Sequence, residues 1–120
     1  MKKKIYYLST CSTCARIMEA LEINERNGFE LQDIRSRKIT PEQLDEMHDL
    51  AGSHVSLFSK RSLKYKELGL KNKILTEADY REFILQYDTF LKRPVVIIGD
   101  QIFIGSQKKT IEALKAALES

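Results

Sequence analysis

Two cysteines separated by two residues are the part of this sequence best suited to chemistry. The segment Cys11-Ser12-Thr13-Cys14 follows a short apolar run and begins a stretch with helical periodicity. A thiol in the first turn of a helix faces unpaired backbone N–H groups and the positive end of the helix dipole, and both favour the thiolate. The spacing also allows a disulfide between the two sulfurs. We therefore predict a redox-active pair, with Cys11 as the nucleophile and Cys14 as the resolving thiol.

Two other interpretations of the cysteines stay open at this point. Free cysteines are often small buried hydrophobic residues without reactivity. Zinc needs about four ligands, and the two histidines, His48 and His54, have a spacing that zinc fingers also show. However, the chain between Cys14 and His48 is far longer than the roughly 12 to 15 residues of a finger, and a predicted helix and strand occupy it. The sequence therefore predicts no metal site, and we expect no bound cofactor.

Arg93-Pro94 is the second feature with chemical potential, because it directly precedes an apolar β-rich run. Proline at the start of a strand removes a ladder donor, and a cis X–Pro bond is a specific turn feature. A loop that holds this proline beside the redox helix would place the Arg93 guanidinium near the Cys11 sulfur. There it would favour the thiolate and hold an oxyanion. A surface arginine before an ordinary trans proline explains the same residues equally well.

The elements that must position these residues are indicated by periodicity and by helix end signals. Residues 4–8 are β-branched and aromatic, which predicts a strand. Helical spacing then runs from Cys11 to about Asn27 and stops at Gly28. Residues 29–34 form a second predicted strand. Strand, helix and strand within about 30 residues predict a βαβ unit with parallel strands and a right-handed crossover.

The middle of the chain predicts helices only. Thr40, Pro41 and Gln43 form a helix start with a capping box, and Gly52 ends that helix. Further helical segments are expected at 54–59, at 63–68 and from Thr76 onwards.

A hairpin and a helix are predicted for the last third of the chain. Gly99-Asp100 separates the β-rich runs 95–98 and 101–104, which is typical of a two-residue turn. An amphipathic helix follows through Ile111, Leu114 and Leu118. The whole order predicts an α/β fold with a four-stranded mixed sheet, which is the thioredoxin topology with a helical insertion at approximately 40–91.

The length and composition exclude several classes of protein. A chain of 120 residues with 42% hydrophobic and 31% charged residues suits a single domain, 1–120, and is neither disordered nor fibrous. No apolar run approaches the ~18 residues of a membrane span, and the apolar run after the first lysines is too short for a signal peptide. We therefore expect a cytoplasmic protein that does not associate with membranes.

Charge is distributed unevenly along the chain. Residues 40–50 hold only acidic charges, whereas residues 60–73 carry six cationic side chains against Glu67, a net charge of +5: Lys60, Arg61, Lys64, Lys66, Lys71 and Lys73. Two solvated helix faces of opposite sign explain this pattern, and a site for an anion or an acidic partner is the alternative. The total of +3 does not indicate direct binding to nucleic acid.

Several segments taken together resemble the ArsC family, which includes glutaredoxin-dependent arsenate reductases, YffB-type small reductases and Spx-type transcriptional regulators. The matching segments are Cys11, Ser59-Lys60-Arg61-Ser62, Tyr65 to Leu70, Arg93-Pro94-Val95-Val96 and Ile104-Gly105. The resemblance covers nearly the whole chain. It implies a thioredoxin-like fold with a helical insertion, Cys11 as the catalytic cysteine, and Arg93 beside it before a cis proline.

The sequence also departs from the arsenate reductases it resembles. Those proteins have one active cysteine, whereas this chain has a CxxC pair, as Spx does. By this resemblance, one of their three anion-binding arginines falls on Ser59 and another near Gly105, so only Arg93 is kept. Arg61 is the candidate replacement. Ser12, Thr13, Arg61 and Pro94 are therefore the predicted anion- or substrate-binding residues, beside the catalytic Cys11, Cys14 and Arg93.

Two functions follow from the resemblance and the residues. The first is a monomeric ArsC-family thiol–disulfide oxidoreductase whose external reductant is thioredoxin, glutaredoxin or a low-molecular-weight thiol, with arsenate as the substrate class that the resemblance implies. The alternative is an Spx-like redox-sensing regulator that binds RNA polymerase, in which the disulfide is a signal.

Overall fold

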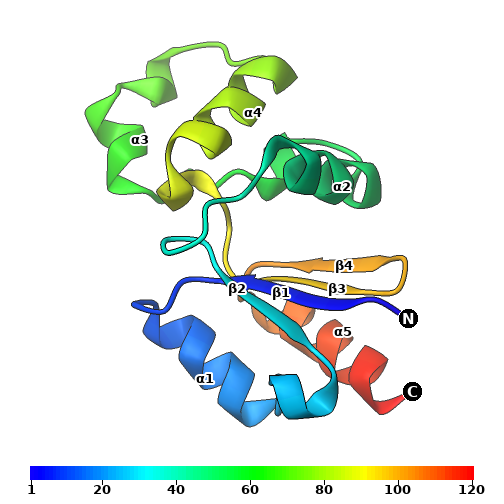
Figure 1. Cartoon of the computed structure of the whole chain (residues 1–120). Coiled ribbons are helices and arrows are strands. Elements are labelled where there is room, and N and C mark those ends of the chain that lie inside the picture. The colour runs from blue at the N-terminus through cyan, green and yellow to red at the C-terminus, as the bar shows by residue number, and fades with distance from the viewer. The chain divides into compact units, whose positions relative to one another are not determined.

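Four strands form one mixed sheet in the order β2-β1-β3-β4 in the computed structural model, which describes residues 1–120 (Figure 1). Their bounds are β1 (Lys3–Tyr7), β2 (Glu30–Asp33), β3 (Val95–Ile98) and β4 (Gln101–Ile104). β1 runs parallel to β2 and antiparallel to β3, and β3 and β4 form the antiparallel hairpin. The predicted α/β class and the thioredoxin-like sheet are therefore confirmed.

Two helices cover one face of this sheet (Figure 1): α1 (Ser12–Ala20) and α5 (Lys108–Glu119). The helices bury one stripe each, because their apolar residues recur at helical spacing. Leu114 of α5 is 1% exposed. The core here consists of buried side chains from β1, β3, α5 and the α1–β2 connection: Ile5, Ile23, Phe29, Val96, Ile98 and Leu114.

The predicted helix from Cys11 to Asn27 is too long, because α1 ends at Ala20. Glu22 adopts a left-handed conformation, with φ of 53°, which turns the chain. The Ile23 N–H then bonds to the Met18 carbonyl at 2.9 Å, closing the helix end, and the Ile23 side chain enters the core. A short 3₁₀ turn at Glu25–Asn27 leads into Gly28.

The chain divides into two compact units, of which the sheet with α1 and α5 is one. That unit is Met1–Lys38 with Arg93–Ser120, and the second is Ile39–Lys92. The second unit contains α2 (Pro41–Ala51), α3 (Leu63–Glu67) and α4 (Glu77–Gln86), with 3₁₀ turns between and after them (Figure 1). These turns lie at Val55–Leu57, Leu70–Asn72 and Asp88–Phe90.

Capping boxes begin the two longer helices of the second unit. The Thr40 hydroxyl accepts a hydrogen bond from the Gln43 N–H, and the Gln43 side-chain oxygen accepts one from the Thr40 N–H, as the sequence predicts. Thr76 and Asp79 repeat this arrangement before α4. Gly52 ends α2 with φ of 90°, a left-handed conformation that residues other than glycine rarely adopt.

Aromatic side chains form much of the core of the second unit. Phe58 and Phe90 are stacked, with ring centroids 4.8 Å apart, and both are fully buried. The backbone around them is also paired, since Ser59 N–H donates to Phe90 and Lys92 N–H donates to Leu57. This pairing joins the segment after α2 to the last residues of the second unit. None of the helices in either unit is both long and apolar enough to cross a membrane.

Candidate active site

Cys11 occupies the N-cap position of α1, directly after the turn that follows β1. Its backbone is extended, with φ of −90° and ψ of 108°, and its sulfur accepts the Cys14 N–H at 3.4 Å. The Cys11 N–H in turn donates to the Leu8 carbonyl at 2.9 Å, which fixes the turn. The sulfur therefore stands where an N-cap oxygen usually does, at the positive end of the helix.

The surroundings of Cys11 stabilise its thiolate. Partial burial alone would raise the pKa of the Cys11 thiol, but the Cys14 N–H, the Cys14 thiol, the Arg93 charge and the Thr13 N–H more than offset it. The net result is a lowered pKa. A lowered pKa together with partial exposure to solvent is the environment that favours nucleophilic reactivity in a cysteine.

Cys14 lies one helical turn further along α1 and has the opposite character. Its side chain faces the protein interior, and the residue is only 1% exposed. Burial raises the pKa of the Cys14 thiol to about 11, helped by the hydrogen bond that this thiol shares with the Cys11 sulfur. Both cysteines are free thiols in this structure. Cys14 is therefore a protonated thiol in contact with an activated sulfur.

The sheet register brings Arg93-Pro94 to the same end of the sheet as Cys11. β1 and β3 are antiparallel neighbours, and Tyr6 lies opposite Val95, so the exit from β1 adjoins the start of β3. The Arg93–Pro94 peptide bond is cis. The positive charge of Arg93 lowers the pKa of both thiols. Pro94 itself is buried, and its carbonyl accepts the Gly105 N–H at 2.9 Å.

The other predicted site residues divide between the two units. Ser12 and Thr13 are the first two residues of α1, Ser12 exposed and Thr13 half-buried, beside Cys11. Arg61 lies in the second unit, exposed, just before α3. The first unit thus brings together six of the seven predicted residues, whereas Arg61 stays a prediction.

Gly105, next to the position where the resemblance to arsenate reductases expects an arginine, follows the end of β4. Its φ is 86°, a left-handed conformation in which a larger residue is strained, even though no atom lies within 4 Å of the position that a Cβ would take. The backbone here favours glycine. Space for a side chain is present, but the chain conformation is unsuited to an arginine.

Asp33 is a positioning residue that sequence reasoning missed. Its carboxylate accepts the Ser9 N–H at 3.4 Å and the Arg35 N–H at 3.2 Å. A hydrogen bond from the Ser9 side chain is the largest cause of the lowered pKa of Asp33, and the backbone N–H groups of Arg35 and Ser9 lower it further. Asp33 ends β2, which is parallel to β1, so it anchors the turn that presents Cys11. The position of this carboxylate at the end of the second predicted strand was the sequence signal that could have identified Asp33.

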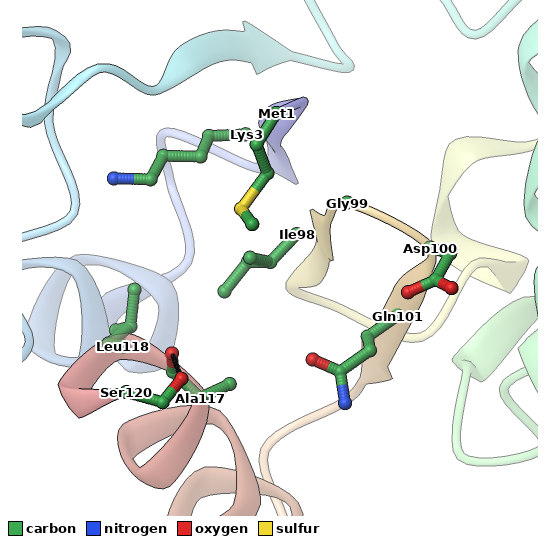
Figure 2. Close-up of a pocket in the computed structure, with 9 residues that line it drawn as sticks. All are labelled: Met1, Lys3, Ile98, Gly99, Asp100, Gln101, Ala117, Leu118 and Ser120. Atoms are coloured by element: carbon green, nitrogen blue, oxygen red, sulfur yellow. Dashed lines mark hydrogen bonds between the residues drawn. The ribbon is translucent and has the colours of Figure 1, made fainter.

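A separate pocket lies at the other end of the sheet (Figure 2). Met1 and Lys3 line it from the start of β1, Gly99 and Asp100 from the hairpin turn, and the end of α5 completes it. Cys11 follows the opposite end of β1, so this pocket does not belong to the thiol site.

The model of the ArsC family matches residues 6–114. The chain belongs to the ArsC family. No curated protein matches it. Among solved structures, an ArsC-family-related protein from Bacteroides fragilis is 26% identical, with a TM-score of 0.76 and coverage of 95% of this chain and 98% of the other.

Two further structures support the same ArsC fold. A Staphylococcus aureus protein is 27% identical, with a TM-score of 0.71 and coverage of 92% of this chain and 96% of the other. An arsenate reductase from Vibrio cholerae is 19% identical, with a TM-score of 0.76 and coverage of 96% and 97%. The second of these likenesses concerns the fold alone.

Proposed function

We propose that this ArsC-family chain is a thiol–disulfide oxidoreductase that cycles between a Cys11/Cys14 dithiol and a disulfide. The observation that carries the proposal is the opposite acid strength of two neighbouring thiols: the pKa of Cys11 is lowered, whereas that of Cys14 is raised to about 11. An attacking thiol needs thiolate character, and a resolving thiol that stays protonated does not compete for the substrate.

The proposed cycle begins when the Cys11 thiolate attacks one sulfur of an oxidised substrate disulfide. A mixed disulfide forms, and the other substrate sulfur leaves as a thiolate that takes up a proton. Cys14 then loses its proton and attacks the Cys11 sulfur, which releases the second substrate thiol and forms the Cys11–Cys14 disulfide. An external thiol of the thioredoxin, glutaredoxin or low-molecular-weight class reduces this disulfide by two further exchange steps.

Arg93 has an electrostatic role in this cycle. Its guanidinium stabilises the Cys11 thiolate before attack and balances the charge of an anionic substrate group. Ser12 and Thr13 are the proposed anion-binding residues beside Cys11, at the positive N-terminal end of α1.

The test combines intact-mass measurement with single cysteine variants. The dithiol protein is treated with peroxide, and wild type is expected to lose two hydrogens without forming a dimer. Cys14→Ser is expected to accumulate a mixed disulfide with a model disulfide substrate, whereas Cys11→Ser should accumulate none. A Cys11→Ser protein that traps substrate as well as Cys14→Ser does would contradict the assignment.

A second candidate function, an Spx-like regulator that binds RNA polymerase, is favoured by the surface of α3 and the turn after it. The cationic residues of 60–73 lie in and on both sides of α3 and the turn at Leu70–Asn72, and Leu63 and Ile74 in the same stretch are 77% and 99% exposed. Apolar side chains among positive charges suit an acidic protein partner. Co-purification with RNA polymerase, comparing reduced and oxidised protein, separates this function from a purely enzymatic one.

A further inference from the structure

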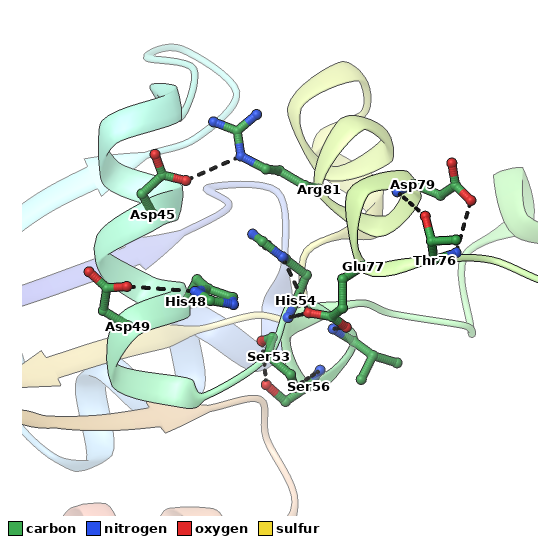
Figure 3. Close-up of polar contacts among 11 residues, drawn as sticks. Asp45, His48, Asp49, Ser53, His54, Ser56, Thr76, Glu77, Asp79 and Arg81 are labelled. Carbon is green, nitrogen blue, oxygen red and sulfur yellow. Dashed lines mark hydrogen bonds and ion pairs between the residues drawn. The ribbon is translucent and has the colours of Figure 1, made fainter.

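Three potential metal ligands from separate parts of the second unit come together, away from the cysteines in sequence. His48 lies on α2, His54 lies in the connection after it, and Glu77 is the first residue of α4 (Figure 3). One ring nitrogen from each histidine and one carboxylate oxygen lie within 4.8 Å of one another.

His54 is a buried polar side chain in this cluster whose hydrogen-bonding groups are not fully paired. The residue is only 8% exposed, its Nε2 has no hydrogen-bond partner, and the Glu77 carboxylate is the partner of its Nδ1. Glu77 Oε1 lies 3.3 Å from its Nδ1. Buried polar groups are normally paired, because leaving one unpaired costs about 1–3 kcal/mol. A ligand that accepts an imidazole lone pair would satisfy this side chain.

We propose that His48, His54 and Glu77 bind a divalent transition-metal ion of the zinc class. Two imidazoles and one carboxylate form a donor set that such ions accept in proteins, with a water molecule in the fourth position. Ligands on a tetrahedral ion with bonds of about 2.0–2.1 Å are separated by roughly 3.3 Å. The separation between His54 Nδ1 and Glu77 Oε1, 3.3 Å, already has this value.

Glu77 is held in place and charged by backbone donors. Its carboxylate accepts the N–H groups of both His54 and Val55. The hydrogen bond from His54 N–H is the largest cause of the lowered pKa of Glu77. Each carboxylate oxygen keeps a second lone pair, so these bonds orient the group and leave it able to bind a cation.

His48 provides both the access route and the third ligand. Its side chain is 37% exposed, and the Asp49 carboxylate lies 3.6 Å from its Nδ1. A carboxylate at one ring nitrogen leaves the other, Nε2, for a metal ion, which is the usual outer-shell arrangement of ligating histidines. The ring stacks on His54 with centroids 4.2 Å apart. Because His48 is partly exposed and His54 is buried, the His48 ring has more freedom to adjust to a metal ion.

The consequence of binding is a link between α2 and α4. One ion pair already joins these helices, between Asp45 and Arg81 at 3.2 Å (Figure 3). A metal ion would add a second link at the other end of the contact and connect the His54 segment to both helices. Because an ion that binds only the folded state stabilises it by mass action, thermal stability should rise with metal concentration.

The experiment uses full-length, tag-free protein in which both cysteines are replaced, Cys11→Ser and Cys14→Ser, so that thiols cannot bind the metal. Co²⁺ is titrated and followed by its visible absorption, and the melting temperature is measured with and without Zn²⁺. We expect one Co²⁺ per chain and a Zn²⁺-dependent rise in melting temperature. His48→Gln and Glu77→Gln should each weaken Co²⁺ binding at least tenfold.

Glu42→Gln serves as the matched control, since it removes an exposed carboxylate from the same helix as His48 but outside the cluster. This variant should bind Co²⁺ as the cysteine-free parent does. His48→Gln is expected to keep the fold, because His48 is partly exposed, and circular dichroism checks that the variant is folded. Absence of one-to-one binding in the parent, or equal binding by the parent and folded His48→Gln, would overturn the proposal. Because thiols are absent, neither result bears on the oxidoreductase function.

Discussion

Cys11 and Cys14 are the same residue on the same helix, and their positions alone make them chemically different. Cys11 meets the open N-terminus of α1 and the charge of Arg93, whereas Cys14 is buried against the sheet. Reactivity towards an alkylating agent follows the thiolate fraction and the access to the sulfur. Both factors favour Cys11.

This difference predicts the order of alkylation. Limiting iodoacetamide at neutral pH should label Cys11 at least tenfold faster than Cys14, as measured by peptide mapping. Once Cys11 is blocked, labelling of Cys14 should stay slow at neutral pH, because burial, the largest cause of its raised pKa, remains. Equal labelling of both cysteines, or faster labelling of Cys14, would contradict the assigned roles.

Arg93 provides a second prediction for single residues. Replacing it in Arg93→Gln removes a positive charge that stabilises the thiolate, so the pKa of Cys11 should rise and alkylation at neutral pH should slow. Lys92→Gln is the matched control, because it removes a neighbouring exposed charge that does not act on Cys11. Measuring the rate of Cys11 alkylation against pH gives the pKa of Cys11 in each variant. The idea fails if the two variants shift this pKa equally.

The helix caps carry a prediction at the scale of elements. Thr40→Ala removes the side-chain oxygen that accepts the Gln43 N–H at the start of α2. Loss of such a cap typically costs about 0.5–2 kcal/mol in the free energy of unfolding. Urea denaturation should show this loss, whereas Thr110→Ala, inside α5 and without a capping bond, should change stability much less. Equal losses would exclude a capping role.

Elements with local signals were predictable from the sequence, and those fixed by distant packing were not. The Thr40 cap, the Gly99-Asp100 turn and both hairpin strands have signals within a few residues, and all are confirmed. The end of α1 was placed too late, because helical spacing continues past Leu21. Only the turn at Glu22 and the burial of Ile23 end the helix.

The candidate site shows the same division. Only two residues separate Cys11 from Cys14, so the proximity of the two thiols was predictable from the sequence. Asp33 was missed because its contact to Ser9 depends on the pairing of β1 with β2. Glu77 was missed because it meets His54 only through the packing of α4. The expectation of no metal site considered the histidines with Cys14, and not with a carboxylate that begins a later helix.

The whole molecule carries a prediction about arsenate. Attack on this anion by a thiolate brings negative charges together, and each charge-assisted hydrogen bond that offsets them contributes on the order of 1.5–3 kcal/mol. By the same resemblance, one arginine of the arsenate reductases falls on Ser59 and another near Gly105, so the barrier should rise by several kcal/mol, or at least about a hundredfold in rate. We expect slow or undetectable arsenate turnover beside measurable reduction of a model disulfide.

Coupled NADPH oxidation with thioredoxin or glutaredoxin measures both reactions. Arg61→Ala and Arg93→Ala are compared with wild type, because Arg61 is the remaining cation that would replace the lost arginines. Brisk arsenate turnover that both substitutions abolish would contradict this prediction and would assign Arg61 to the site.

The insertion of the second unit between β2 and β3 affects how the protein emerges from the ribosome. β1 pairs with β3, and Lys3 lies opposite Ile98, so a central contact of the sheet joins distant parts of the nascent chain. Synthesis proceeds at about 5–20 residues per second, so β1, α1 and β2 wait several seconds for their partners. The second unit, in contrast, is one continuous segment whose residues are all synthesised before β3. During translation the inserted unit therefore has all its residues before the sheet can be completed, and the thiols reach their final surroundings only after Arg93 and the hairpin have been added.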